Sequence, residues 1–300
     1  MMAMRDKNVM ITGPTEGIGR ATAFALAERG ARLHLLCRNP SKADALRAEL
    51  VSKHAGIDVE LYIADLGSFE QVRQAASTFI ERNEPLDVLI NNAGVINTRR
   101  ILLDNGQEQM FAVNHLGHFL LTTLLLDSLK RAEQGRVIVV ASEAYRFCRG
   151  IRWDDLQWQE GFSAFPTYGH SKLANILFAR ELAERLKGSR VTANALHPGG
   201  VRSQLGAQNN WYAGRILVLV KPFLRTAEKG AETSVYLATS DEVVATSGEY
   251  FYNCKQKKTK AYARDREQAQ RLWALSEGLV GATARNVANL SPSSRTPSSE

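Results

Sequence analysis

Two residues four positions apart, Tyr168 and Lys172, lie in a segment whose apolar residues recur at helical spacing. On a helix, side chains four apart project from one face, so both can reach the same ligand. A free tyrosine has a pKa of about 10 and is a poor acid or base at neutral pH, but a nearby positive charge stabilises the phenolate and lowers that pKa. The pair predicts proton transfer at Tyr168, with an electrostatic role for Lys172.

A serine, Ser142, ends the expected strand Arg136–Ser142 and should face the same cleft. A hydroxyl in that place can donate a hydrogen bond to an oxygen on which negative charge develops. Each residue also has a purely structural explanation, because a serine at a strand end is commonly a cap and a Tyr/Lys pair at helical spacing arises by chance. Their combination favours a reaction site.

The sequence TGPTEGIG, from Thr12 to Gly19, is a glycine-rich turn that directly follows an apolar strand and opens into a helix. The amides at such a helix N-terminus can hold a pyrophosphate. The three-residue gap between Gly13 and Gly17 differs from the commoner dinucleotide spacing, so an ordinary loop is the alternative. The residues that we expect to bind a dinucleotide here are Gly13, Thr15, Gly17, Ile18 and Gly19.

Arg38 follows the second expected strand, where NAD-preferring enzymes usually place a carboxylate for the ribose 2′-hydroxyl. A guanidinium suits a 2′-phosphate instead, so Arg38 favours NADP(H), with NAD(H) as the alternative. Glu16 opposes this preference because it adds negative charge near the same pocket. The structural explanation of Arg38 is a solvent-facing arginine at a strand end.

Two further segments follow strands at the carboxyl edge, where ligands bind in open α/β sheets. Asp65 and Leu66 follow the third expected strand, and Asn91-Asn92-Ala93-Gly94 follows the fourth. We expect Asp65, Leu66, Asn92, Ala93 and Gly94 to line the cofactor. The alternatives are that Asp65 caps a helix starting near Ser68 and that the asparagine pair forms a turn.

Strand-length apolar runs alternate with amphipathic helical segments, which predicts right-handed crossovers and a parallel sheet. The expected strands are Asn8–Thr12, Arg32–Cys37, Asp58–Ile63, Asp87–Ile90, Arg136–Ser142, Arg190–Leu196 and Gly248–Tyr252. The expected helices are Ile18–Arg29, Ser41–Lys53, Phe69–Arg82, Gln107–Arg131, Thr167–Leu186 and Glu228–Leu237. We therefore predict one α/β domain over residues 1–280, a doubly wound, mostly parallel Rossmann fold with seven strands and helices on both faces. The remainder, 281–300, is rich in Ser and Pro and should be a disordered tail.

Together these motifs, with Asn114 and Pro198-Gly199, resemble the short-chain dehydrogenase/reductase superfamily over about residues 8–280. Three stretches, Tyr168–Asn175, Leu196–Gly199 and Gly248–Phe251, are similar to its retinol dehydrogenase-like branch, which includes relatives of protochlorophyllide reductase. The resemblance implies an NAD(P)-dependent oxidoreductase that moves hydride between a nicotinamide and a carbonyl or alcohol carbon.

The resemblance also implies a role for each matching residue. Tyr168 is the general acid in reduction, Ser142 bonds the carbonyl oxygen, and Lys172 holds the nicotinamide ribose and lowers the pKa of the tyrosine. Asn114 positions a relay water. The residues bordering the nicotinamide are Pro198, Gly199, Val201 and, in contact with its carboxamide, Ser203. The alternative is a non-catalytic nucleotide sensor or scaffold on the same fold.

The segments Phe147–Pro166 and Val201–Arg225 are expected to fold over the cleft. Their aromatic residues either form an apolar pocket for a lipophilic ketone, aldehyde or alcohol, or pack these segments onto the domain; they are Trp153, Trp158, Phe162, Phe165, Trp211, Tyr212 and Phe223. Members of the family often pair through the helices near Gln107–Arg131 and Thr167–Leu186, so a homodimer or homotetramer is expected.

The composition and charge of the chain narrow the kinds of partner and metal site that we expect. The net charge is +7, but the basic residues are scattered apart from the lysines between Lys255 and Lys260, which we interpret as a solvated loop, so no nucleic-acid partner is expected. The three cysteines form no Cys-x-x-Cys pair, and the histidines lack carboxylate or thiolate partners at suitable spacing, so no metal site is expected.

No signal-peptide-like region precedes the first strand, which favours the cytoplasm. The stretch Trp211–Leu224 is too short and too charged to span a bilayer, although it suits peripheral membrane contact, and a membrane-surface or nucleic-acid protein is the alternative from the interaction class.

Overall fold

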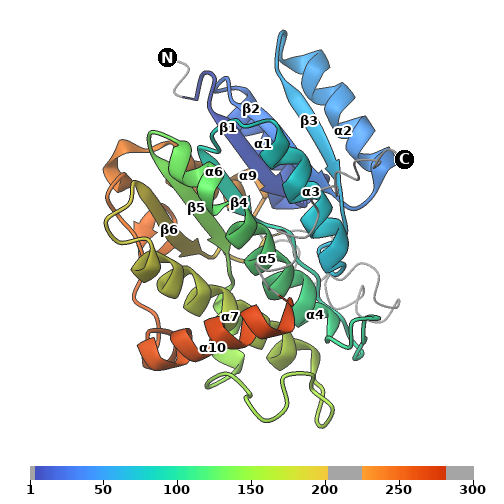
Figure 1. Cartoon of the computed structure of the whole chain (residues 1–300), viewed down its shortest axis with the longest axis vertical. Helices are drawn as coiled ribbons and strands as arrows, with labels where there is room; N and C mark the ends of the chain where they lie inside the picture. Colours follow the sequence, from blue (N-terminus) through green and yellow to red (C-terminus); the bar gives the residue numbers. More distant parts are fainter. Residues whose placement is uncertain (1–3, 202–224, 282–300) are drawn as a thin grey trace, which may run out of the picture.

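A mostly parallel β-sheet runs through the centre of the molecule in the computed structural model, which describes residues 4–201 and 225–281 (Figure 1). The strands lie in the order β3-β2-β1-β4-β5-β6-β7-β8. Their bounds are β1 (Asn8–Thr12), β2 (Arg32–Cys37), β3 (Val59–Ile63), β4 (Val88–Asn91), β5 (Gly135–Val140), β6 (Val191–Leu196), β7 (Tyr250–Tyr252) and β8 (Lys255–Gln256). This confirms the predicted fold class, with one strand more than the seven expected. The added strand, β8, is an antiparallel edge strand of two residues within the lysine-rich segment that was interpreted as a loop.

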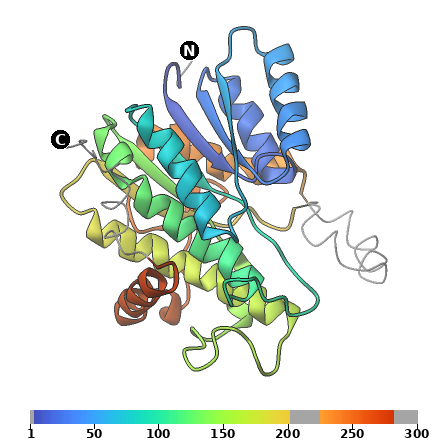
Figure 2. The same cartoon turned by 45° about the vertical axis from the view of Figure 1, so that its right-hand side comes forward.

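Helices cover both faces of the sheet (Figures 1 and 2). One face carries α1 (Gly17–Ala27), α2 (Pro40–Lys53) and α9 (Ala227–Thr239). The other carries α3 (Phe69–Glu81), α5 (Gly117–Leu124), α7 (Ala164–Arg185) and α10 (Arg266–Leu279). Side chains alternate along each strand. In β1, Val9 and Ile11 pack on the side of the sheet that α1, α2 and α9 cover, whereas Met10 packs on the side of α3, α5, α7 and α10. Because both faces are covered, the strands are apolar throughout.

The strand order reverses between β1 and β4, because the chain runs outward from β1 through β2 to β3 and then returns to the other side of β1. In open α/β sheets, ligands bind at the carboxyl ends of the strands at such a switch point. The glycine-rich turn after β1 and the Asn92–Gly94 segment after β4 therefore lie next to each other, as the sequence predicted.

The single helix expected over Gln107–Arg131 is instead four consecutive helical segments. They are α4 (Gln109–Phe111), a π-helical turn η1 (Ala112–Leu116), α5 and α6 (Leu126–Arg131). Wider π turns inside helices are frequent at functional sites, and this one contains Asn114. Helical periodicity over the whole segment could not distinguish this local widening from a regular helix.

The C-terminal helix α10 was not predicted from the sequence. Asp265 accepts a hydrogen bond from the Gln268 amide at 3.1 Å and caps this helix. Its buried positions, Ala269, Leu272, Trp273 and Ser276, recur at helical spacing, which is the signal that could have revealed it.

Trp273 anchors α10 to the rest of the molecule. Its ring lies 4.9 Å from Phe119 of α5 and 5.9 Å from Phe178 of α7, measured between centroids. Ser276 adds a polar contact, at 2.9 Å from His115 Nε2. The helix thus covers part of the α5 and α7 surface through which the family resemblance suggested pairing of subunits.

We expect Trp273→Ala to lower the free energy of unfolding by about 3–5 kcal/mol, because truncating a buried aromatic leaves a cavity. Urea unfolding followed by circular dichroism measures the change. Phe165→Ala, which removes an aromatic that is 61% exposed, is the matched control and should change the stability little. Equal stability of the two variants would show that α10 contributes little to the core.

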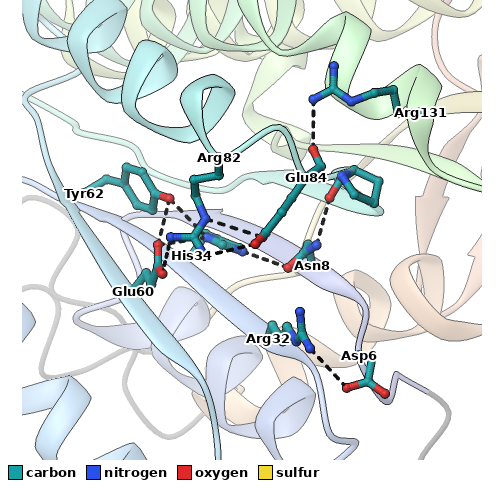
Figure 3. A network of polar contacts seen from close by, with 10 residues as sticks. Asp6, Asn8, Arg32, His34, Glu60, Tyr62, Arg82, Glu84 and Arg131 are labelled. Carbon is teal, nitrogen blue, oxygen red and sulfur yellow. Dashed lines mark hydrogen bonds and ion pairs between the residues drawn. The ribbon is translucent and has the colours of Figure 1, made fainter.

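A polar network lies at the amino ends of β1 and β2, opposite the switch point (Figure 3). His34 is buried between Asn8 Oδ1, at 3.1 Å, and the Tyr62 hydroxyl, at 3.2 Å, and an ion pair joins Arg82 to Glu60 beside it. Burial lowers the pKa of His34 to about 4, so the neutral ring links the first three strands. Because that pKa lies below the usual 6.5, this contribution to stability is complete above pH 6.5 and declines toward pH 4.

Candidate active site

Tyr168 and Lys172 lie one turn apart on α7, and both side chains are buried, at 9% and 2% exposed. The Lys172 ammonium donates a hydrogen bond to the Val140 carbonyl at 2.9 Å and lies 5.6 Å from the centre of the Tyr168 ring. Val140 is the last residue of β5, so the hydrogen bond places the ammonium at the carboxyl end of the sheet. The predicted shared face of the helix is present.

Ser142 lies beside Tyr168, two residues beyond the end of β5. Its Oγ accepts a hydrogen bond from the Ala144 amide at 3.1 Å, which caps the short 3-10 helix η2 (Glu143–Phe147), and its hydroxyl lies close enough to the Tyr168 phenol to lower the pKa of that group. Ser142 is therefore a helix cap, and the same side chain lies beside Tyr168. Gly169 makes the approach possible, because a Cβ there would overlap the Ala144 carbonyl oxygen.

The two titratable groups respond to burial in opposite directions. Burial raises the pKa of Tyr168 to about 12, and the hydrogen bond from Ser142 acts in the other direction. Burial lowers the pKa of Lys172 to about 8. The expected lowering of the tyrosine pKa by Lys172 does not occur in this structure, where burial dominates and Ser142 is the group that acts to lower it. At neutral pH the phenol is protonated, which suits a proton donor.

Asn114 connects the π turn to both neighbouring segments. Its Oδ1 accepts from the Val95 amide at 2.7 Å, and its Nδ2 donates to the Val95 carbonyl and to Ser171 Oγ, at 3.0 and 2.9 Å. Ser171 Oγ in turn donates to the Tyr168 carbonyl at 2.7 Å. The amide of Asn114 is therefore fully oriented, and it ties the end of β4 to the catalytic helix.

A buried chain of hydrogen bonds runs from Asn114 to the glycine-rich turn. His118 Nδ1 lies 3.0 Å from the Asn114 carbonyl, which can only accept, and His118 Nε2 lies 2.8 Å from Thr12 Oγ1. The Thr12 oxygen also accepts from the Asn92 and Ala93 amides, each at 2.9 Å. Burial lowers the pKa of His118 to about 3, so the ring is neutral and donates from Nδ1. Sequence reasoning missed Thr12 and His118 as parts of the site.

The glycine-rich turn has the close packing that a dinucleotide site requires. Gly13 has φ +62°, and a Cβ there would lie 2.9 Å from Ala93; a Cβ on Gly19 would overlap the Gly13 carbonyl. Asn92 Nδ2 closes the turn by donating to the Thr12 and Gly13 carbonyls, at 2.9 and 3.2 Å. Gly17, Ile18 and Gly19 form the first turn of α1, with Thr15 just before it, so their amides point toward the switch point.

Gly94 faces the two side chains that would hold a ribose. A Cβ at this position would lie 3.4 Å from Asn114 Oδ1 and 3.5 Å from Lys172 Nζ, so the space above the glycine is shared by an acceptor and a cation. A nicotinamide ribose, with its two hydroxyl groups, fits this donor and acceptor set. The residues present therefore fit a nicotinamide dinucleotide that extends from the glycine-rich turn to Lys172.

At the adenosine end, Arg38 is exposed and makes no ion pair within residues 4–201 and 225–281. Glu16, which the sequence analysis placed against a phosphate, forms an ion pair with Lys42. Its charge is therefore partly compensated. Asp65 Oδ1 accepts from the Gly67 amide at 2.7 Å, whereas Ser68 caps α3, so the capping explanation of Asp65 is wrong. Leu66 is buried beside it.

The loop after β6 carries the residues expected beside the nicotinamide. Pro198 and Gly199 follow His197, Gly199 has φ +85°, and Val201 bridges to Arg225. Ser203 lies outside the described residues, as do Trp211, Tyr212, Phe223 and the predicted tail from 282 onward.

The described aromatics divide into two groups. The Trp153 indole donates to Gln268 Oε1 at 2.8 Å and packs on α10, and the buried Trp158 contacts His170 and Arg152, so these two pack the segment onto the domain. Phe165 is 61% exposed and lies 5.7 Å, between ring centroids, from Phe147, which is 60% exposed. Phe147 ends η2 and Phe165 lies in the first turn of α7, so this exposed pair offers an apolar surface at the start of that helix, whereas Phe162 is partly buried.

A metal site and a membrane-spanning helix are two other features that bear on function. Within the part of the chain that the structure describes, no three His, Cys, Asp or Glu side chains gather as metal ligands. In the same residues, no helix combines the length and the apolar character that crossing a membrane requires.

Comparison with known proteins relates this geometry to a family. A family model described as short chain dehydrogenase matches residues 7–212. Human retinol dehydrogenase 14 is 42% identical over 299 residues, covering 93% of this chain and 87% of the relative, and human retinol dehydrogenase 13 is 41% identical over 290 residues, covering 94% and 86%. An uncharacterised protein from Mycobacterium paratuberculosis has a crystal structure with TM-score 0.74, 33% identity and coverage of 92% and 94%. A gluconate 5-dehydrogenase structure from Beutenbergia cavernae with bound NADP, at 23% identity and TM-score 0.68, covers 84% and 96% and shares the fold.

Proposed function

The chain belongs to the short-chain dehydrogenase family, in its retinol dehydrogenase-like branch, and we propose that it transfers hydride between NADP(H) and the carbonyl or alcohol carbon of a lipophilic ketone, aldehyde or alcohol. The observation that carries the proposal is the convergence of Ser142, Tyr168 and Lys172, with Asn114 Oδ1 and Lys172 Nζ both next to Gly94.

In the direction of reduction, the chain's own residues handle the proton and the oxygen. A nicotinamide whose ribose is held by Asn114 and Lys172 would supply the hydride that the carbonyl carbon accepts. Ser142 donates a hydrogen bond to the carbonyl oxygen, which gains negative charge, and Tyr168 gives that oxygen its proton, so a C=O becomes CH–OH and a phenolate remains. The Lys172 ammonium stabilises this phenolate. A water held between Asn114 and Lys172 then returns a proton from solvent.

Preference for the phosphorylated cofactor rests on Arg38, since a guanidinium is the side chain best suited to a 2′-phosphate. The ion pair between Glu16 and Lys42 supports it by reducing the opposing negative charge. NAD(H) remains the alternative cofactor.

We expect Arg38→Asp to lower kcat/KM for NADPH about 10- to 100-fold while changing that for NADH much less, because one charge-assisted phosphate contact contributes about 1.5–3 kcal/mol. Initial rates at 340 nm with each cofactor measure the ratio. Arg47→Asp, on the exposed side of α2, is the matched charge change and should leave the ratio unaltered. An unchanged ratio in Arg38→Asp would assign cofactor preference to other residues.

The proposal of a lipophilic substrate is supported by the exposed pair Phe147 and Phe165, which lie five residues after Ser142 and three before Tyr168. The names of the curated relatives, retinol dehydrogenases, agree with an apolar substrate for those proteins.

We expect Phe147→Ser together with Phe165→Ser to raise KM for medium-chain aldehydes about tenfold, because the two exposed rings together can bury roughly 50 Å² against an alkyl chain at about 25 cal/mol per Å². A short, polar aldehyde is the control substrate, and its KM should stay unchanged. A panel in which sugars or hydroxy acids react faster than medium-chain aldehydes would contradict the apolar pocket.

The proposed function is tested by following NADPH and NADH oxidation with a panel of apolar aldehydes and ketones. Turnover in the wild-type protein supports it. Nicotinamide binding without any turnover would favour the alternative of a sensor or scaffold, and absence of binding would contradict both.

Assembly and location remain proposals. A homodimer or homotetramer would have to form around α10, which covers part of α5 and α7, and sedimentation velocity measures this. A cytoplasmic location, with peripheral membrane contact as the competing outcome, is tested by fractionation of cells that express the full chain.

A further inference from the structure

A cluster of charged and aromatic side chains begins at Glu143, the residue that follows Ser142. Glu143 Oε2 is 2.7 Å from Lys257 Nζ and 3.2 Å from His197 Nε2. His197 is only 5% exposed, whereas Glu143 and Lys257 are each about one third exposed. None of the three is assigned a role in the proposed reaction.

The hydrogen bonds fix the tautomer of His197. The Gly199 amide donates to His197 Nδ1 at 3.2 Å, and the Lys257 ammonium lies 3.3 Å from Nε2. Because the backbone amide can only donate, Nδ1 is an acceptor and the neutral ring carries its proton on Nε2, so the Lys257 contact with Nε2 is not a hydrogen bond. The Nε2 proton then faces the Glu143 carboxylate, and Lys257 donates to the same oxygen. One carboxylate therefore receives both the imidazole and the ammonium.

Aromatic stacking holds the imidazole in this orientation. The Tyr252 ring is nearly parallel to it, 4.2 Å away at an interplanar angle of 8°, and Tyr250 lies 5.7 Å away at 18°. Arg225 donates to the Tyr252 hydroxyl at 2.7 Å. The ring cannot rotate without losing these contacts.

The cluster joins three segments that are far apart in the sequence. Glu143 begins η2 next to Ser142, His197 precedes the Pro198–Gly199 turn, and Lys257 follows the β7–β8 hairpin. The Gly199 amide donates to the His197 imidazole, and this bond sets the position of the turn. The contact between His197 Nε2 and Glu143 sets the distance between the turn and Ser142, the residue before Glu143.

We propose that Glu143, His197 and Lys257 are positioning residues that hold the Pro198–Gly199 turn in register with Ser142, and thereby set the distance between the nicotinamide and the hydroxyls of Ser142 and Tyr168. This inference rests on the proposed function, because it assigns the turn to the nicotinamide. The three residues act through Gly199 and Ser142 and do not touch the reacting atoms.

The charges around His197 provide a readout that a merely structural role would not change. The groups facing it are Glu143, Lys257, Arg225, Arg146, Tyr250 and Tyr252. Burial, assisted by Lys257 and the two arginines, lowers the pKa of His197 to about 4, whereas Glu143 raises it. A proton added to Nδ1 would oppose the Gly199 N–H, so protonation breaks the contact that orients the turn.

The experiment compares Lys257→Met and Glu143→Gln with the wild-type full chain. NMR titration of histidines labelled at Cε1, with His197→Gln to assign the signal, reports the pKa of His197 directly. We expect Lys257→Met to raise the pKa of His197 and Glu143→Gln to lower it, because the two variants remove opposite charges. In Lys257→Met, kcat should fall about tenfold with KM for the carbonyl substrate unchanged, as expected when reacting groups are misplaced.

Two further variants separate positioning from folding. Lys257→Arg keeps the charge and should restore most of kcat, and Lys258→Met changes the exposed neighbouring lysine and should match the wild type. If the wild type turns over NADPH but Lys257→Met behaves like Lys258→Met, or the two pKa shifts have the same sign, the inference is overturned while the proposed function stands. If the wild-type chain does not bind NADPH, the proposed function fails first.

Discussion

Tyr168→Phe is expected to reduce kcat for carbonyl reduction about 1,000-fold while leaving the Kd for NADPH nearly unchanged. The buried phenol interacts with Ser142 and keeps its proton at neutral pH, and loss of a positioned general acid typically costs about 10²–10⁴-fold. Phenylalanine fills the same buried space, so the loss in stability should be limited to one hydrogen bond, about 1 kcal/mol. Initial rates, NADPH fluorescence titration and thermal unfolding measure the three quantities.

Tyr262→Phe is the matched control, since it removes a hydroxyl from a half-buried tyrosine that packs beside Tyr145. It should retain wild-type kcat. If Tyr168→Phe also kept more than a tenth of the activity, another group would have to deliver the proton, and the assignment of Tyr168 would be wrong.

Lys172→Met is expected to reduce kcat about 100-fold and to weaken NADPH binding, yet to leave the protein as stable as the wild type or more so. Catalysis loses the charge that stabilises the tyrosinate, an electrostatic contribution of the size measured for preorganised donors. Stability gains because burying the ammonium is costly, as its lowered pKa indicates, and a methionine of similar volume has no such cost. The Val140 carbonyl keeps Asn175 Nδ2 as a donor at 3.4 Å.

The same lysine predicts a pH dependence with a defined sign. With a pKa of about 8, Lys172 is charged at neutral pH, and carbonyl reduction should decline as the pH rises through 8. That decline should be absent from the residual activity of Lys172→Met. Lys187→Met, an exposed lysine just beyond the end of α7, is the control and should keep both the activity and the alkaline decline. A fall in the stability of Lys172→Met by several kcal/mol would contradict the argument from burial.

Local sequence patterns were sufficient for the architecture and for part of the candidate site. Alternating apolar strands and amphipathic helices predicted the parallel sheet, because each element must bury one stripe or both faces. The spacing of Tyr168 and Lys172 placed both on one side of a helix, since four residues make about one turn. The glycine-rich turn fell between strand and helix, where its amides must point toward the switch point.

Contacts between distant segments could not be obtained in this way. Asn114 meets Ser171 across 57 residues, and Lys257 meets Glu143 across 114. The π turn at Asn114 also escaped prediction, because its composition is that of an ordinary helix. Glu16 illustrates the consequence: by position it opposed a phosphate, but its pairing with Lys42 alters that electrostatic argument.

The sequence by itself determined which groups this protein offers for chemistry and which element carries each, since helical and strand periodicities are local properties. Only the tertiary structure decided how those groups meet. It brought Ser142 against Tyr168 through the close packing allowed by Gly169, raised the pKa of Tyr168 and lowered that of Lys172 by burial, and joined Glu143 to His197. Distances and desolvation depend on all the neighbours of a residue at once, and those neighbours are assigned only when the chain folds.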